Sequence, residues 1–151
     1  MENLYKLKPI GIVRSNLKTK EEAIKSKTDE NIGEIEIFKE YGEGLNDIDG
    51  FSHIVVIFWM DKSSFRSLKV RPIYYPDKLR GVFATKHPDR PNPIGITVVE
   101  LLKRKRNVLK VKGIDMLDGT PVLDIKPYTK SYQKVPTKFG WFPKRDDTNG
   151  G

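Results

Sequence analysis

The sequence predicts a mainly β fold: a small closed or barrel-like sheet with few short helices, followed by a C-terminal tail. Apolar residues alternate with polar ones in short runs, which is the period of half-buried strands rather than of helices. Gly, Pro or Asn bound these runs and mark turns. Eight such runs lie within about 125 residues, a spacing typical of closed all-β sheets.

Two runs define the sheet most clearly. In 33–38, Ile35 and Ile37 fall on one side of a strand, and Glu34 and Glu36 fall on the other. This strand is therefore expected to have one solvent-exposed face. The run 52–60 is almost continuously apolar and rich in β-branched residues, as expected for a central strand covered on both faces. This second run is predicted to form the backbone of the core.

The other elements are assigned by the same patterns. Strands are expected over 9–14, 70–75, 81–85, 94–102, 108–114 and 122–125, with Arg106 and Asn107 at the tip of a hairpin. Short helical turns are expected near 19–23 and 44–49, and the polar stretch 14–31 is expected to be a loop. Residues 1–128 are therefore predicted to form one β-barrel domain, and 129–151, which mix Lys, Pro and aromatic residues, a partly ordered tail.

Composition narrows the classes of site and location. The 151 residues contain no cysteine and two histidines, so a disulfide framework is excluded and a structural zinc site nearly so; no metal is expected. The N-terminus lacks the apolar core of a secretory signal, and no apolar run approaches the roughly 18 residues of a membrane span. A cytoplasmic protein that does not associate with membranes is expected.

The charge balance predicts a polyanionic partner. The formal net charge is +8, which favours salt-sensitive binding to nucleic acid, although simple solubility would also explain an excess of lysine. The two signs are segregated: 34–49 are acidic, whereas Lys62 to Arg71 and Lys103 to Arg106 form basic clusters. This segregation favours a binding face over uniform solubilisation.

Residues 81–95 are the first candidate for a site. Three prolines in six residues make the loop stiff, and each disfavours helical geometry in the residue before it, which includes Arg90 and Asn92. Such a loop presents its side chains with little entropy left to lose, which suits binding. A rigid connection with an incidental arginine explains the same pattern equally well.

Residues 115–128 are the second candidate. Asp118 and Gly119 mark a tight turn, and the strand that follows brings Asp124, Lys126 and Tyr128 close together in the sequence. Strict alternation places Asp124 on the same face as Val122, so Asp124 points away from the core or is buried with a partner. A solvated surface carboxylate is the simpler explanation.

Five ordered segments resemble a known family: 9–15, 50–54, 82–85, 90–95 and 117–128. Through them the chain resembles the TsaA-like (TrmO-type) family of S-adenosylmethionine-dependent tRNA adenosine-N6 methyltransferases, in its short archaeal form. The resemblance implies a small β-barrel, a homodimer with S-adenosylmethionine bound near the interface, and methylation of N6 of threonylcarbamoyl-adenosine beside the anticodon of tRNA.

The resemblance also implies roles for individual residues. The expected cofactor-binding residues are His53, Arg90, Asn92, Pro93, Ile94, Leu117, Asp118, Gly119 and Thr120, and the expected catalytic residues are Asp124, Asn92, Lys126 and Tyr128. Asp124 or Asn92 is expected to accept a hydrogen bond from N6–H, while Arg90 positions the cofactor and Lys126 a phosphate. The sequence departs from the family at Ile24–Ser26 and around Asp61–Lys62, which weakens the expected cofactor contacts there.

Three other functions stay open: a non-catalytic RNA-binding barrel, a hydrolase, and a dimerisation module, which would leave the stiff loop at 90–93 unexplained. A non-catalytic RNA-binding barrel would use the same basic face, and a hydrolase built on carboxylates and His53 would lack a Gly-x-Ser-x-Gly elbow. His53 is also well explained as an imidazole at the edge of the core whose nitrogen satisfies a backbone group. The aromatic residues of the tail, among them Trp141, would stack on an RNA loop or cover either the barrel end or a second copy.

Overall fold

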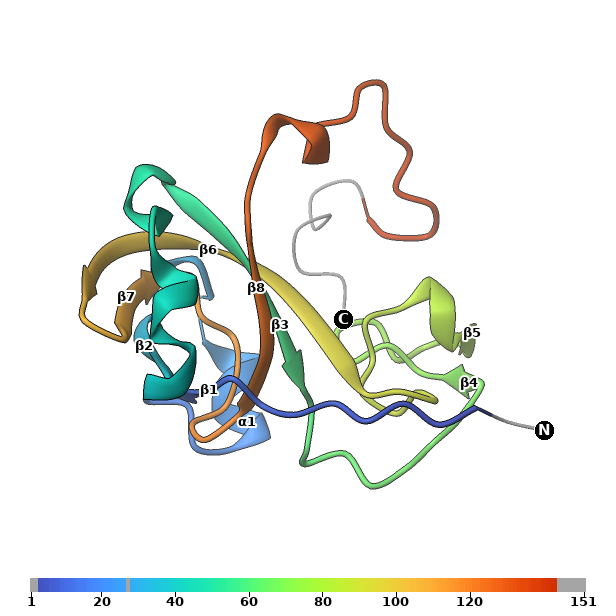
Figure 1. Ribbon diagram of the computed structural model, residues 1–151. Coiled ribbons are helices and arrows are strands. Elements are labelled where there is room, and N and C mark those ends of the chain that lie inside the picture. Colours follow the sequence, from blue (N-terminus) through green and yellow to red (C-terminus); the bar gives the residue numbers. More distant parts are fainter. Residues whose placement is uncertain (1–2, 27, 144–151) are drawn as a thin grey trace. The chain divides into compact units, whose positions relative to one another are not determined.

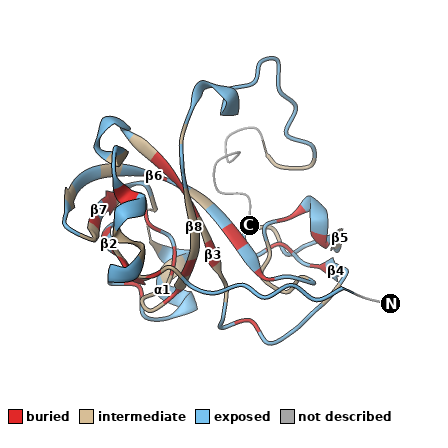
Figure 2. Ribbon diagram, viewed as in Figure 1, coloured by how far each residue is buried: buried red, intermediate tan, exposed pale blue. Residues whose placement is uncertain are grey.

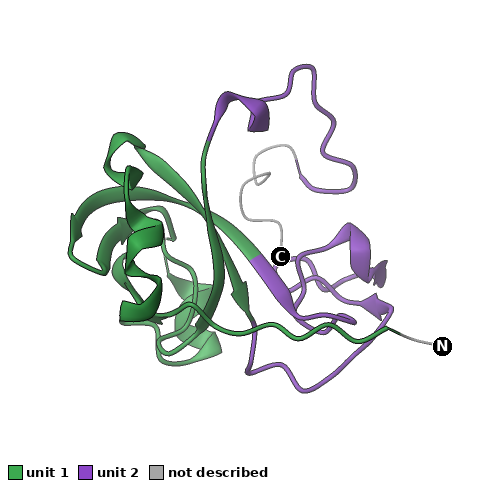
Figure 3. Cartoon of the chain, in the orientation of Figure 1, with its two compact units in different colours: residues 1–59, 96–128 green, residues 60–95, 129–151 purple. Residues whose placement is uncertain are grey.

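A computed structural model describes residues 3–26 and 28–143 of the chain. These residues group into two compact units (Figure 3). The barrel unit comprises Met1–Trp59 and Ile96–Tyr128, and the second unit comprises Met60–Gly95 and Thr129–Gly151. The division into 1–128 and 129–151 expected from the sequence stays a prediction.

The sheet is a closed antiparallel barrel, as the sequence predicts (Figure 1). The order of strands around it is β1-β2-β7-β6-β3-β8. The strands are β1 (Gly11–Arg14), β2 (Ile32–Ile37), β3 (His53–Trp59), β6 (Ile94–Lys105), β7 (Val108–Lys112) and β8 (Pro121–Pro127). Six of the eight expected runs therefore close the barrel.

The core of the barrel follows the predicted alternation (Figure 2). Ile35 and Ile37 on β2 are buried, while the glutamates between and before them face outward. On β3, three consecutive residues from Ile54 to Val56 are buried, so this strand is covered on both faces as expected. Gly11 on β1 allows close strand pairing, because a Cβ there would lie 2.4 Å from the Glu36 carbonyl oxygen.

The connection between β1 and β2 contains more structure than the loop expected over 14–31. Helix α1 (Lys20–Lys25) begins where the sequence predicted a helical turn, and the Thr19 side chain caps it by accepting a hydrogen bond from the Glu22 N–H. A 3-10 turn, η1 (Thr28–Glu30), follows it. The hairpin between β6 and β7 turns at Arg106, which adopts a positive φ of 57°.

The acidic segment after β2 forms two 3-10 helices in place of the single turn expected at 44–49. They are η2 (Lys39–Leu45) and η3 (Ile48–Gly50), and Leu45 is the buried residue of η2. Two glycines within η2 disfavour a longer α-helix. Among the described residues, no helix has the length and apolar character needed to cross a membrane.

The second unit contains little regular structure. Its strands β4 (Lys69–Val70) and β5 (Arg80–Gly81) form a separate two-stranded sheet, followed by η4 (Val82–Ala84) and, after β8, η5 (Lys130–Tyr132). The strands expected over 70–75 and 81–85 are thus wrong for most of their length. Pro72 interrupts the first, and the second turns into η4, whose end Thr85 caps by donating to the Val82 carbonyl.

Candidate functional site

An open hollow of about 600 Å³ lies beside β8 in the barrel unit. Its wall contains Asp124 and Lys126 from β8, apolar side chains including Ile10, Ile37 and Phe51, and the η2–η3 segment with Tyr41, Glu40, Glu43 and Asp47. We refer to it as the β8 hollow. Its walls combine apolar surface with a few polar groups, as ligand sites commonly do.

A β-bulge determines where Asp124 points. Ile57 on β3 pairs with Asp124, but the next residue, Phe58, pairs with Val122, so Leu123 is the extra residue. The bulge separates Val122 and Asp124, which strict alternation had placed on one face. Val122 is fully buried, whereas the Asp124 side chain is 47% exposed. The bulge thus re-aims Asp124 outward to the wall of the hollow.

Both oxygens of Asp124 have partners. Oδ1 accepts a hydrogen bond from the Ile125 N–H at 2.9 Å, and Oδ2 lies 3.0 Å from Lys126 Nζ. Because Lys126 is two residues along the same strand, its side chain reaches the carboxylate on the same face. This ion pair fixes the orientation of the carboxylate while leaving it accessible to a ligand.

The predicted turn 117–120 is part of a different site. Gly119 has a φ of 84° and the turn closes through the Thr120 N–H, which donates to the Leu117 carbonyl, so the tight turn is confirmed. Asp118 lines a second open hollow of about 590 Å³ together with Arg14, Lys18 and Lys110. The two hollows share no lining residue.

Asp118 ties this turn to the segment after β1. Lys18 Nζ donates to its Oδ2 at 2.8 Å, and the Ser15 backbone N–H donates to its Oδ1 at 3.0 Å. These hydrogen bonds, the one from Lys18 first, lower the pKa of the Asp118 carboxyl below its ordinary value. The carboxylate therefore acts as a structural link, and the cofactor role expected for it stays a prediction.

His53 and Tyr128 lie together at the end of the β3–β8 pair. Their ring centroids are 6.1 Å apart, and the Tyr128 N–H donates to the His53 carbonyl. His53 Nδ1 lies 2.8 Å from the Ser52 hydroxyl, so its partner is a side chain and not the backbone group considered from the sequence. The half-buried imidazole is thus explained by local packing, whatever further role it has.

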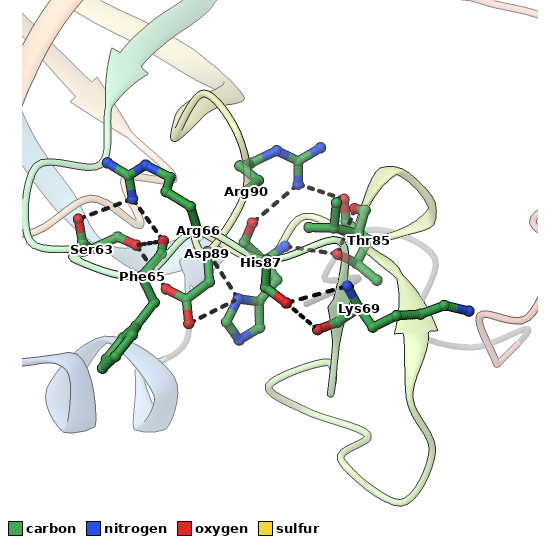
Figure 4. A network of polar contacts seen from close by, with 10 residues as sticks. Ser63, Phe65, Arg66, Lys69, Thr85, His87, Asp89 and Arg90 are labelled. Carbon is green, nitrogen blue, oxygen red and sulfur yellow. Dashed lines mark hydrogen bonds and ion pairs between the residues drawn. The ribbon is translucent and has the colours of Figure 1, made fainter.

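Arg90 organises the proline-rich loop of the second unit (Figure 4). Its Nη1 donates to two carbonyls of the same loop, Thr85 at 2.9 Å and His87 at 3.1 Å. Asp89 accepts from the Ser63 hydroxyl at 2.7 Å and lies 4.0 Å from His87 Nδ1. Arg90 therefore stiffens the loop, and its expected contact with a cofactor would have to use its other nitrogens.

The remaining predicted residues of this loop differ in exposure. Asn92 is exposed and its carbonyl accepts from the Ile94 N–H at 2.7 Å, while Pro93 is buried and its carbonyl accepts from the Met60 N–H at 2.7 Å. The second bond joins the two ends of the 60–95 segment. The Asn92 side chain is thus available to a ligand, and the Pro93 carbonyl is already engaged.

The structure brings Asp124 and Lys126 together, and His53 with Tyr128, but it separates the turn 117–120 from the β8 hollow. The side chains of η2 and η3 that line this hollow, such as Tyr41 and Glu43, were not predicted as site residues. The sequence feature that could have indicated them is the acidic stretch 34–49, which by itself shows only a concentration of negative charge. No group of three or more potential metal ligands occurs among residues 3–26 and 28–143.

Curated proteins that resemble the chain are described as cofactor-binding proteins or methyltransferases. It is 45% identical over 140 residues to a probable S-adenosyl-L-methionine-binding protein of Pyrococcus abyssi, covering 91% of this chain and 76% of the relative. An S-adenosyl-L-methionine-binding protein of Archaeoglobus fulgidus is 49% identical over 124 residues, 82% of this chain and 88% of the relative. The human tRNA (adenine(37)-N6)-methyltransferase is 41% identical over 98 residues, 64% of this chain but 22% of that protein.

Solved structures and a family model agree with these relatives. A crystal structure of TrmO matches with a TM-score of 0.78 and 34% identity over 93% of this chain, and TrmO from Pseudomonas aeruginosa with 0.76 and 31% over 93%. The chain spans 65% and 64% of those two structures. The model of the tRNA-methyltransferase O N-terminal domain matches residues 12–134. The chain has a closed β-barrel and the five family-like segments in the expected order, and the family model covers most of its length. It therefore belongs to the tRNA-methyltransferase O N-terminal domain family.

Proposed function

We propose that this protein transfers a methyl group from S-adenosylmethionine to N6 of an adenosine beside the anticodon of tRNA, with threonylcarbamoyl-adenosine as the preferred target. Membership of a methyltransferase family supports the reaction class, and the names of archaeal relatives support the cofactor. The named mammalian relatives support an adenine N6 in tRNA as the acceptor. A cytoplasmic location is consistent with such a substrate.

The observation that supports this function best in the structure is Asp124 at the wall of the β8 hollow. An exocyclic amine is a poor nucleophile because its lone pair delocalises into the ring. A carboxylate that accepts one N6–H helps to localise that pair on nitrogen and receives the proton released on transfer. Lys126 holds this carboxylate in place through the 3.0 Å ion pair, so it acts as a positioning residue.

The lining of the β8 hollow fits the chemistry of the methyl donor. S-adenosylmethionine combines a sulfonium and an ammonium with a flat adenine. Glu40, Glu43 and Asp47 supply negative charge for the cations, and Phe51 with its apolar neighbours supplies a surface for the ring. When bound, this group supplies the activated methyl. The same carboxylates disfavour a phosphate near Lys126, so its expected phosphate contact is the weaker part of the prediction.

The other predicted residues and the oligomeric state stay proposals. Arg90, Asn92 and the turn 117–120 do not line the β8 hollow, so their expected cofactor roles compete with the placement of the cofactor there and stay predictions, as does the expected catalytic role of Tyr128. A homodimer is supported by apolar side chains on the outer face of β6, where Ile96 is 58% exposed, Val98 43% and Leu102 40%. A second copy would cover this surface.

The test combines cofactor binding with single-turnover transfer. We expect calorimetry to detect binding of S-adenosylmethionine, and labelled methyl to pass to an anticodon stem-loop carrying threonylcarbamoyl-adenosine but much less to an unmodified one. Replacing Asp124 with Asn should lower the single-turnover rate about a hundredfold with RNA affinity unchanged. Glu30→Gln, which removes an exposed carboxylate from η1 in the same unit, is the matched control and should transfer at the normal rate.

Two results would change this conclusion. Normal transfer by the Asp124 variant would remove that residue from the chemistry while leaving the reaction in place. No cofactor binding at millimolar concentration, combined with salt-sensitive RNA binding, would favour the non-catalytic RNA-binding barrel.

A further inference from the structure

The net positive charge of the protein is confined to one of its two units. The second unit contains 13 of the 28 basic residues but only 5 of the 20 acidic ones, a net charge of +8. The barrel unit contains the other 15 of each sign, and these cancel. The whole excess of the chain therefore belongs to the second unit, although the barrel unit contains its own basic run at 103–106.

Most of these cations are exposed and several are held in fixed positions. Arg66 Nη1 donates to the Phe65 carbonyl at 2.7 Å and the Ser63 carbonyl at 3.3 Å, and Arg71 Nη1 donates to the Pro76 carbonyl at 3.0 Å. In each guanidinium, Nη1 thus donates to a nearby backbone carbonyl, and the other nitrogens are left to contact a ligand. Cations ordered in this way lose less entropy when they bind an anion.

Large aromatic side chains are exposed on the same unit. Phe83 is 76% exposed, Phe65 72% and Phe139 47%. Phe83 projects from η4, in which its neighbour Val82 is buried, and Figure 4 shows the Phe65 ring turned away from the polar network of Arg66 and Asp89. Exposed phenyl rings are costly in water, and next to ordered cations they suit stacking on unpaired bases.

Trp141 has a different role from these phenylalanines. Its Nε1 donates to the Ala84 carbonyl at 2.8 Å, its ring meets Tyr75 edge-on at 6.3 Å, and the Arg80 guanidinium lies 4.7 Å from the ring centroid. Trp141 thus anchors the tail to the 60–95 segment. Lys134 and Lys138, which precede it, are exposed and add their charge to this unit.

We propose that the second unit is the RNA-binding surface of the protein. It holds a single-stranded loop by stacking bases on Phe65 and Phe83, and it contacts phosphates with the exposed Lys62, Lys69 and Lys86 together with the ordered Arg66 and Arg71. This inference rests on the proposed function, because it names the surface that grips the RNA substrate. Charge complementarity selects a polyanion as the partner, and the exposed rings select unpaired bases over a duplex.

The test compares two triple variants with the same change in net charge. Lys62, Lys69 and Lys86 are replaced by Gln in one protein, and Lys103, Lys105 and Arg106 of the barrel unit in the other. Binding of a fluorescein-labelled anticodon stem-loop is measured by anisotropy over a range of salt concentrations. We expect the first variant to raise Kd at least about tenfold and to reduce the slope of log K against log salt by about 2, and the second to change neither appreciably.

The aromatic component is tested separately. Phe65→Ala and Phe83→Ala should each raise Kd for the stem-loop about tenfold, with little effect on binding of a fully paired RNA of the same length. Tyr5→Ala removes an exposed aromatic side chain from the barrel unit and should leave both values unchanged. Circular dichroism and melting temperature check that each variant is folded.

Outcomes for this inference and for the proposed function are distinguishable. Equal loss of binding in both triple variants, or loss only in the barrel variant, would overturn the inference even if the wild type methylates RNA. RNA binding that depends on the second unit, in a protein that transfers no methyl group, would support the inference and refute the function. No RNA binding at low salt, or binding only to acidic proteins, would overturn the inference.

Discussion

Among the described residues, 15 of the 17 buried apolar side chains belong to the barrel unit, and only Val70 and Val82 belong to the second unit. The barrel is thus stabilised mainly by removing apolar surface from water, whereas the second unit depends on hydrogen bonds within its loops, such as those of Arg90 and Arg66. A core-poor, polar unit opens more readily than a packed barrel. The difference teaches that the apolar core lies in one unit, whereas the polar contacts that order the loops lie in the other.

The largest effect should come from the barrel core. Ile54 is fully buried on β3, so Ile54→Ala should lower the free energy of unfolding by about 2 to 5 kcal/mol through lost burial and a residual cavity. The melting temperature measures this loss. Leu7→Ala, at a position that is 59% exposed in the same unit, should have little effect.

Val82→Ala tests the same comparison in the second unit. Val82 is buried in the second unit, and its loss should speed hydrogen exchange in 60–95 while leaving the barrel protected. Equal loss of protection in both units would show that they unfold together, which would contradict the contrast drawn above.

Arg90→Ala should have an intermediate effect, limited to the second unit. It leaves the Thr85 and His87 carbonyls without their guanidinium donor, which costs about 1 to 3 kcal/mol for charged hydrogen bonds in a partly buried position. Hydrogen exchange over 85–92 should become faster. Lys86→Ala, an exposed neighbour, is the control, and an unchanged exchange rate in the Arg90 variant would show that the loop is stiffened by its prolines alone.

The smallest effect should come from Asp118 in the barrel unit, and it should depend on pH. The pKa of the Asp118 carboxyl lies below its ordinary value of 3.8 because Lys18 and the Ser15 N–H donate to the ionised form. Its contribution to stability is therefore present above the unfolded-state pKa and is lost as the pH falls through the lower folded-state pKa. Asp118→Asn should lose at most about 1 kcal/mol, since the ion pair is partly exposed.

Thermal melts as a function of pH check this prediction. The gap between wild type and Asp118→Asn should be largest above about pH 5 and should close in acid. Asp49→Asn, which removes an exposed carboxyl from the same unit, should follow the wild type at all pH values. A gap that stays constant into acid would mean that the carboxylate charge does not contribute.

Patterns of short range allowed most of the barrel to be predicted. The alternation in 33–38 and the apolar run in 52–60 report burial directly, because a strand has a fixed period and a fixed number of covered faces. The strands expected over 70–75 and 81–85 were wrong because the apolar residues there have the pattern of a strand without forming one. Pro72 cannot donate a backbone hydrogen bond to a neighbouring strand, and Thr85 caps the 3-10 helix η4.

Composition, local patterns and family resemblance were enough to predict the β class, the order of the barrel strands along the chain, the absence of cysteine chemistry and the family. Two features of the site became visible only in the folded chain: the bulge at Leu123 turns Asp124 to the β8 hollow, and Lys18 engages Asp118. In the folded chain, Trp141 also joins the tail to 60–95, so that the excess charge gathers in one unit. Periodicity describes neighbours along the chain, whereas each of these features depends on residues brought together from distant positions, which no local pattern specifies.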